Sequence, residues 1–241
     1  MAQFSNVPRK RAAAALMGLV ALAAITEPSL AVARPVTVVE LFTSQGCSSC
    51  PPANANLIHL KDEPGVLALS FSVTYWDYLG WKDIFGRKTY TARQEMYEAP
   101  LGESGAFTPQ MVIDGRISLV GRDLAKVQSA VQKSAARPRK GAPTIALEKE
   151  RVSISAGAAP SRPADVWLVR YDPHVVNVAI RRGENTGRTL PQSNVVHGLV
   201  YLGRWSGSPA NFPRGPVSFG GKTAILVQSP QGGPILAAAT D

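Results

Sequence analysis

Cysteine and histidine are scarce in this chain. Its 241 residues include two cysteines and three histidines. So few cysteines exclude a scaffold stapled by several disulfides. The histidines (His59, His174 and His197) form no closely spaced pair that would complete a zinc site with the two cysteines. We therefore expect no resident metal ion and no other cofactor.

Aromatic residues and clustered charges are also few. Aromatics make up 7% of the chain, and the net charge of +9 is dispersed apart from the run Arg137-Pro138-Arg139-Lys140. No basic stripe is interleaved with aromatic residues, as nucleic-acid binding surfaces usually are. We expect no nucleic-acid partner.

One long uncharged apolar stretch is present, at residues 12–25. It follows Arg9-Lys10-Arg11 and precedes Ala31-Val32-Ala33, which together give the pattern of a cleavable export signal. The stretch is shorter than the roughly 20 residues that a membrane span needs. The sequence predicts a signal peptide at 1–33, cleavage near Ala33, no stable membrane span afterwards, and a periplasmic or secreted protein.

The two cysteines stand together as Gly46-Cys47-Ser48-Ser49-Cys50-Pro51, directly after an apolar run at 36–42. A C-x-x-C between a strand and a helix is typical of a redox-active dithiol, because a helix N-terminus stabilises a thiolate. Two other interpretations are an inert clip, which would close a very small loop, and half of a metal site. We expect Cys47 to be the exposed attacking thiol and Cys50 the resolving thiol.

The proline after the second cysteine qualifies this prediction. A residue before proline is disfavoured in the helical region, whereas proline suits the first helical turn, so the helix is expected to begin at Pro51. Fewer helix N–H groups would then face Cys47. We expect a moderate thiol, less oxidising than one flanked by histidine.

The pattern of the chain changes near residue 140. Before it, apolar runs predict strands at 36–42, 66–73, 110–113 and 116–120 and helices at 54–61, 86–98 and from Asp123 to Pro138. After it, short strands are predicted at 144–147, 151–155, 166–171, 175–180, 195–202 and 224–228. The sequence predicts an α/β, thioredoxin-like domain at 34–138, a linker at 139–143, and a small all-β domain, an antiparallel sheet or sandwich, at 144–241.

The C-x-x-C after the first strand and Thr108-Pro109 before the third resemble the thioredoxin superfamily. That resemblance implies that Pro109 follows a cis peptide bond facing the dithiol, and that the backbone of Thr108 is an edge on which a substrate docks. Gly46 and Trp76 are further candidate substrate-contacting residues.

The chain also resembles a family of exported bacterial proteins of unknown function. The resemblance rests on five stretches, at residues 40–52, 75–83, 91–94, 108–115 and 182–190. It implies a fold but no reaction.

Three further features have alternative interpretations. Glu40, in the first strand, is either a proton relay for the resolving thiol or a partner in a salt bridge with Arg116 or Lys126. Trp76 and its aromatic neighbours either pack over the sheet or face the substrate. The stretch 182–188 is either a solvated turn, which we favour, or a site that binds a carboxylate or anchors the domain interface.

The sequence therefore favours an exported thiol–disulfide oxidoreductase whose substrate is a protein or a small thiol or disulfide and whose redox partner is unknown. Its catalytic candidates are Cys47, Cys50, Pro109 and Glu40. One alternative is a module that binds Cu(I) through the two thiolates, with His59 as a further candidate ligand. Another is a non-catalytic protein that binds a ligand through its β-rich part.

Overall fold

The computed structural model describes residues 1–3, 36–216 and 221–241. Nearly all of the predicted signal peptide, including its cleavage site, lies outside the described residues. Within the described ranges, none of the helices has the length and apolar character that crossing a membrane requires.

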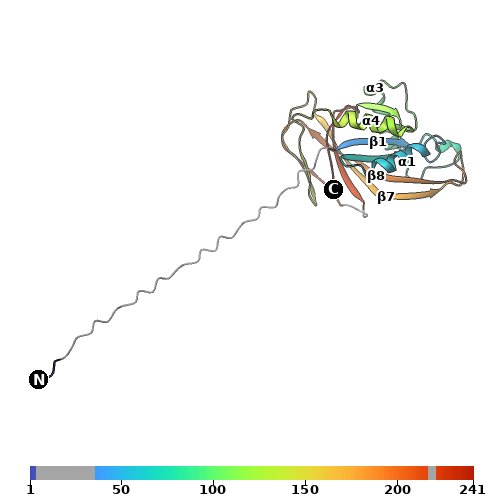
Figure 1. Cartoon of the computed structure of the whole chain (residues 1–241). Coiled ribbons are helices and arrows are strands. Elements are labelled where there is room, and N and C mark those ends of the chain that lie inside the picture. Colours follow the sequence, from blue (N-terminus) through green and yellow to red (C-terminus); the bar gives the residue numbers. More distant parts are fainter. Residues whose placement is uncertain (4–35, 217–220) are drawn as a thin grey trace. The chain divides into compact units, whose positions relative to one another are not determined.

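The first half of the described chain alternates strands and helices (Figure 1). Its elements are β1 (Thr37–Thr43), α1 (Pro51–Leu60), β2 (Val66–Ser72), the 3-10 helix η1 (Asp77–Leu79), α2 (Lys88–Glu95), α3 (Glu98–Leu101), β3 (Gln110–Ile113), β4 (Ile117–Val120) and α4 (Leu124–Ala135). The second half is all strand, with β5 (Ile145–Leu147), β6 (Arg151–Ile154), β7 (Ala164–Ala179), β8 (Thr189–Trp205), β9 (Ala210–Pro213), β10 (Lys222–Gln228) and β11 (Ile235–Thr240).

These strands form one large mixed sheet and one small antiparallel sheet. The large sheet has eight strands in the order β11-β10-β7-β8-β2-β1-β3-β4, and the small one has the order β5-β6-β9. Within the large sheet β1 is parallel to β2 and antiparallel to β3, and β3 and β4 form an antiparallel hairpin. Strands from both sides of residues 139–143 share this sheet, because β8 lies beside β2 through the pair Ser70↔Val195.

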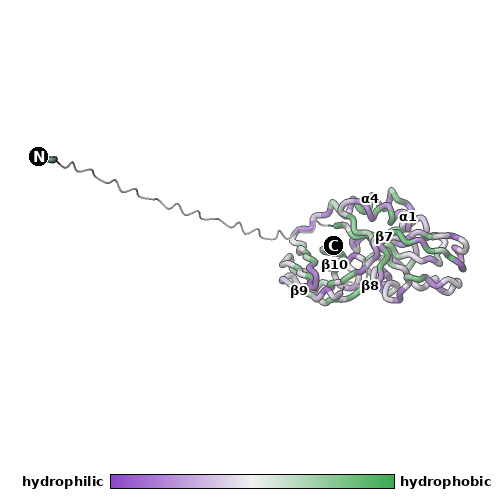
Figure 2. The backbone as a smooth tube through the Cα atoms, turned by 90° about the horizontal axis from the view of Figure 1, so that it is seen from below, coloured by the Kyte–Doolittle hydropathy of each residue, from purple (hydrophilic) through white to green (hydrophobic). Residues whose placement is uncertain are grey.

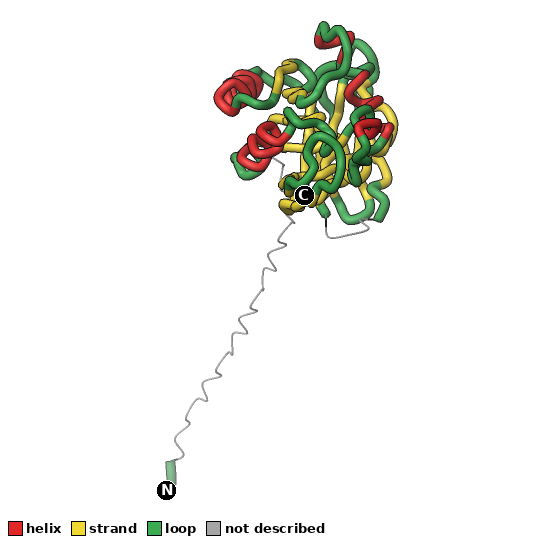
Figure 3. The backbone as a smooth tube through the Cα atoms, turned by 90° about the vertical axis from the view of Figure 1, so that its right-hand side faces the viewer, coloured by secondary structure: helices red, strands yellow, loops and turns green. Residues whose placement is uncertain are grey.

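Alternation along β1 gives the sheet two buried faces. Val39 and Leu41 pack against α1 and α4, whereas Val38 and Phe42 lie in a second cluster with aromatic residues of and after α2. Figure 3 shows α1 and α4 on one side of the sheet and the smaller helices on the other. In Figure 2 the hydrophobic colour concentrates along the strands. All seven residues of β1 are buried, so the segment that leads to Cys47 is fixed on both sides.

Most predicted elements are present, with corrections that have physical causes. The predicted strands 166–171 and 175–180 are parts of the single strand β7, because Asp172 to Val175 forms an irregularity that shifts the register without ending the strand. The predicted helix 86–98 is shorter, as α2, and is followed by the separate turn α3. Strands β9 and β11 were not predicted. The Ala-rich sequence of β11 has low intrinsic strand preference and is held by pairing with β10.

Candidate functional site: a dithiol at the end of the first strand

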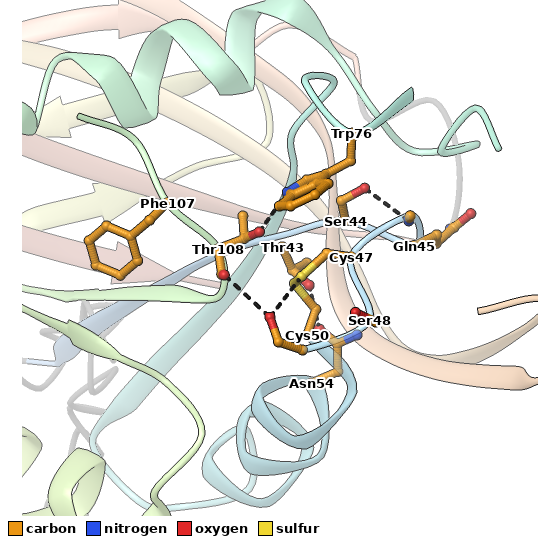
Figure 4. Close-up of a disulfide and its surroundings, with 12 residues drawn as sticks. Thr43, Ser44, Gln45, Cys47, Ser48, Cys50, Asn54, Trp76, Phe107 and Thr108 are labelled. Carbon is orange, nitrogen blue, oxygen red and sulfur yellow. Dashed lines mark hydrogen bonds between the residues drawn. A yellow bond between two sulfur atoms is a disulfide. The ribbon is translucent and has the colours of Figure 1, made fainter. Parts of the chain in front are cut away.

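Cys47 and Cys50 are joined by a disulfide, with their Cα atoms 5.5 Å apart. β1 ends at Thr43, a short turn brings the chain to Cys47, and Cys50 is the N-cap residue of α1. Figure 4 shows the disulfide between this turn and the first turn of the helix. The strand and the helix therefore position the pair as the sequence predicted.

The helix begins at Pro51, also as predicted. Its first two residues are prolines, which carry no N–H group. The next two N–H groups, of Ala53 and Asn54, donate to the carbonyl oxygen of Cys50 at 3.0 and 3.1 Å. The first turn of α1 therefore directs these two hydrogen bonds to the backbone of Cys50 and not to a cysteine sulfur.

Cys47 is buried, and the prediction that it is exposed is wrong. Only 1% of its surface is accessible, while Cys50 has none; between them Ser48 is exposed and Ser49 is half-buried. The Ser49 hydroxyl lies 3.3 Å from the sulfur of Cys47 and 3.5 Å from the carbonyl oxygen of Thr108. Ser49 thus links the dithiol to the segment before β3, where the Thr108–Pro109 peptide bond is cis.

The side chain of Trp76 also lies beside the disulfide (Figure 4). Its indole Nε1 donates a 2.7 Å hydrogen bond to the hydroxyl of Thr108, whereas Phe107 points away from the disulfide (Figure 4). Gly46 allows this close approach, because a Cβ atom there would lie 3.2 Å from both the Cβ and the carbonyl oxygen of Trp76. Gly46, Trp76 and Thr108, proposed separately from the sequence, are neighbours in one chain of contacts.

The tip of the β7–β8 hairpin contacts the backbone of the turn that carries Cys47. Asn185 donates from Nδ2 to the carbonyl oxygens of Gln45 and Cys47, at 2.9 and 3.0 Å, and the carboxylate of Glu184 accepts from the N–H of Ser48 at 3.2 Å. Asn185 has no exposed surface. The preferred prediction of a solvated turn at 182–188 is therefore wrong for Asn185.

A buried polar network around Gln45 holds the same turn in place. Gln45 donates from its backbone N–H to Asp83 and from its side chain to Gln192, and it accepts from the indole N–H of Trp81. Burial raises the pKa of Asp83 to about 6, against hydrogen bonds from Gln45 and Phe85 that lower it. Sequence reasoning missed Gln192. Asp83 and Asn185 lie within stretches that carry the family resemblance, but their contacts with Gln45 were not predicted.

Glu40 lies in a different buried network. Its Oε1 accepts from Nε of Arg93 at 2.6 Å, and its Oε2 accepts from the hydroxyl of Tyr97. Burial alone would lower the pKa of Arg93, but the charge of Glu40 raises it above its usual value, and burial raises the pKa of Tyr97. The salt-bridge partner is thus Arg93, and the prediction of Arg116 or Lys126 is wrong. Glu40 lies on the opposite face of β1 from α4, which carries Lys126, and Arg116 lies in the turn between β3 and β4.

Metal ligands do not converge near the dithiol. In the described part of the chain no group of three or more His, Cys, Asp or Glu side chains could hold a metal ion. His59 is exposed in the last turn of α1, 3.7 Å from Glu63. Because a helix rises about 1.5 Å per residue, the backbone of His59 is about 14 Å along the helix from that of Cys50, so His59 and the dithiol are not brought together.

Comparison with known proteins gives the following relationships. The family described as "Protein of unknown function (DUF1223)" matches residues 38–228. A crystal structure of the Agrobacterium tumefaciens protein AGR_C_4864 is similar, with 29% identity, a TM-score of 0.69, and coverage of 86% of this chain and 94% of that one. HBP35 of Porphyromonas gingivalis shares the fold at 14% identity, with a TM-score of 0.60 and coverage of 86% and 74%. No curated protein matches this chain.

Proposed function

This chain belongs to the DUF1223 family, and we propose that it is an exported thiol–disulfide oxidoreductase that acts through Cys47 and Cys50. The observation that carries the proposal is the disulfide between the only two cysteines of the chain, set between β1 and α1 and next to the Thr108–Pro109 segment. A bridge that spans four residues contributes little to stability through loop closure, so a structural role explains it poorly.

The strand order around the dithiol supports a thioredoxin-like core. Four neighbouring strands lie in the order β2-β1-β3-β4, with β1 parallel to β2 and the other pairs antiparallel. Helices α1 and α4 pack on the same face of β1 and β3. We propose that this unit carries the reaction and that β8, β7, β10 and β11 extend its sheet.

The reaction that this site supports is disulfide exchange in two steps. In the reduced protein the Cys47 thiolate attacks one sulfur of a substrate disulfide; a Cys47–substrate bond forms and the substrate S–S bond breaks, releasing a thiolate that takes up a proton. The Cys50 thiolate then attacks the sulfur of Cys47 and releases the second substrate thiol. Two electrons pass from the dithiol to the substrate, and a dithiol or small-thiol donor of the same compartment reduces Cys47–Cys50 again.

The surroundings of Cys47 suit these steps. The hydroxyl of Ser49, 3.3 Å from the sulfur, can donate to the thiolate. Ser48 is exposed, and Trp76 and Ser49 are half-buried, so they form the edge from which a substrate sulfur would approach. Because Cys47 itself is buried, we propose that this edge opens locally when a substrate docks.

Disulfide turnover by the purified chain without residues 1–33 tests the proposal. We expect reduction of a protein disulfide, with a thiol donor present, at a rate well above that of the donor alone. Cys47→Ser should abolish the increase, and Cys50→Ser should accumulate a mixed disulfide detectable by mass. Ser155→Ala, far along the chain from the dithiol, is the control. Full turnover by Cys47→Ser would overturn the proposal.

A further inference from the structure

Asn185 makes hydrogen bonds through both polar atoms of its side chain, and both bonds from Nδ2 go to the loop that carries Cys47. Its Nδ2 donates to the carbonyl oxygens of both Gln45 and Cys47, and its Oδ1 accepts from Nη1 of Arg188 at 2.8 Å. One carbonyl group precedes Gly46 and the other follows Cys47, so one side chain holds both ends of the Gly46–Cys47 segment. Its complete burial indicates that these bonds are not exchanged with water.

Glu184, the preceding residue, engages the other side of Cys47. Its carboxylate accepts from the N–H of Ser48, the first N–H group after the cysteine. A C-x-x-C thiolate gains much of its stability from nearby N–H groups and positive charge. Here the Ser48 N–H is directed to a carboxylate, and the N–H of Cys50 is directed to the carbonyl oxygen of Cys47 at 3.3 Å.

The same shortage of donors holds at the helix. Pro51 and Pro52 contribute no N–H groups, and those of Ala53 and Asn54 bond to Cys50. The carboxylate of Glu184, an exposed residue, therefore lies against a turn whose N–H groups at Ser48 and Cys50 are already bonded, and the Ser49 hydroxyl is the side-chain donor beside the sulfur of Cys47. Both effects disfavour the reduced, ionised dithiol relative to the disulfide.

We propose that Asn185 and Glu184 are positioning residues of the dithiol: Asn185 holds the Cys47 turn, and Glu184 destabilises the Cys47 thiolate so that the pair is an electron donor. This inference rests on the proposed function and gives a physical reason for its reductive direction. Electrons flow from a dithiol donor to Cys47–Cys50 and on to disulfides of the substrate, with two electrons and two protons transferred at each exchange. The substrate class is a protein or small-molecule disulfide that is reduced.

The charge of Glu184 is tested by Glu184→Gln, which keeps an acceptor for the Ser48 N–H and removes the charge. Two quantities are measured: the equilibrium of Cys47–Cys50 with glutathione, and the midpoint of the pH profile for alkylation of Cys47 in a Cys50→Ala background. We expect the equilibrium to shift about tenfold toward the dithiol, equivalent to about 30 mV, and the alkylation midpoint to move to lower pH. Glu150→Gln, at an exposed position, is the matched control.

Asn185→Ala tests the positioning of the turn, with the exposed Asn177→Ala of the same hairpin as its control. We expect faster alkylation of Cys47 at a pH well above the midpoint, because the turn loses both bonds to Asn185, under conditions in which circular dichroism shows the variant to be folded. If Asn185→Ala does not fold, Glu184→Gln alone decides the proposal. Alkylation and equilibrium values of Glu184→Gln that equal those of Glu150→Gln would overturn it.

These measurements do not depend on turnover. A protein that reduces no substrate but shows the Glu184→Gln shifts would retain the positioning role and lose the proposed function. Turnover that depends on Cys47, without these shifts, would support the function and exclude the role of Glu184.

Discussion

Nε of Arg93 lies 2.6 Å from Oε1 of Glu40, and neither side chain has any exposed surface. The pair joins α2 to β1 on one buried face of the sheet. The hydroxyl of Tyr97 and the side-chain amide of Gln228 also belong to this network. Glu40 bonds directly to Arg93 of α2 and to Tyr97 just after it, and both of these residues bond to Gln228 of β10, so Glu40 is tied to the packing of the sheet.

Glu40→Gln should therefore destabilise the fold and leave disulfide exchange largely unchanged. The substitution leaves the Arg93 charge buried without its counterion, which costs about 3–5 kcal/mol. Urea unfolding measures the loss, and the exchange rate of the folded variant is measured alongside it. A variant of normal stability whose exchange is slow would instead support the proton-relay interpretation.

Asp83 should make stability depend on pH in a particular direction. Its pKa is raised from 3.8 to about 6 by burial, so between these values the folded protein binds more protons at this site than the unfolded chain does. The contribution of Asp83 to the free energy of unfolding is therefore fully present below about pH 4. It falls by about 3 kcal/mol in total as the pH rises through about 6. Denaturant unfolding between pH 4 and 7 should show this slope, and Asp83→Asn should remove it. The exposed Asp62→Asn should retain it.

The hydrogen bond between Trp76 and Thr108 should be measurable by a double-mutant cycle. Thr108→Val leaves the indole N–H without this acceptor, and Trp76→Phe removes the donor, so each single variant should lose about 1 kcal/mol. The double variant should lose less than the sum, because the two residues share one interaction. Additive losses in thermal or urea unfolding would show that the bond contributes nothing.

The same Trp76→Phe variant also tests whether the indole faces a substrate. We expect KM for a protein disulfide to rise while the rate with a small disulfide changes little, because only the larger substrate would reach across the Trp76 side of the site. An equal effect on both substrates would favour a packing role.

Cu(I) binding by the reduced protein, if present, should be independent of His59. The ring stands at the opposite end of α1 from the cysteines, and its ion-pair partner is Glu63. His59→Ala should leave the Cu(I) stoichiometry in a competition titration unchanged, whereas Cys47→Ser should abolish uptake. A loss of affinity in His59→Ala would contradict this geometry.

The sequence predicted the parts of this site that are local. The apolar run before Cys47 and the prolines after Cys50 determine where β1 ends and α1 begins, and short-range patterns carry that information. The contacts of Asn185 with Gln45 and Cys47 could not be predicted in this way. They depend on how far the β7–β8 hairpin extends past β2, and the register shift at Asp172 conceals the length of β7.

Burial was the property predicted least well. Cys47 was expected to be exposed because it is the N-terminal cysteine of the pair, but it is buried, and a hairpin from the second half of the chain bonds to the backbone of its turn. For Glu40, the period-2 alternation that places it opposite Val39 and Leu41 was readable, whereas the identity of its partner depended on where α2 packs.

The position of the covering hairpin also has a consequence for biosynthesis. During synthesis the cysteines emerge long before residues 182–188, and in that interval the hairpin is not yet in contact with their turn. An oxidising catalyst can therefore form the Cys47–Cys50 bond on the nascent chain. Once β8 has docked beside β2, Glu184 and Asn185 bond to the backbone of this turn, and both cysteines are buried. The timing of oxidation relative to completion of the sheet then decides which enzymes can reach this disulfide.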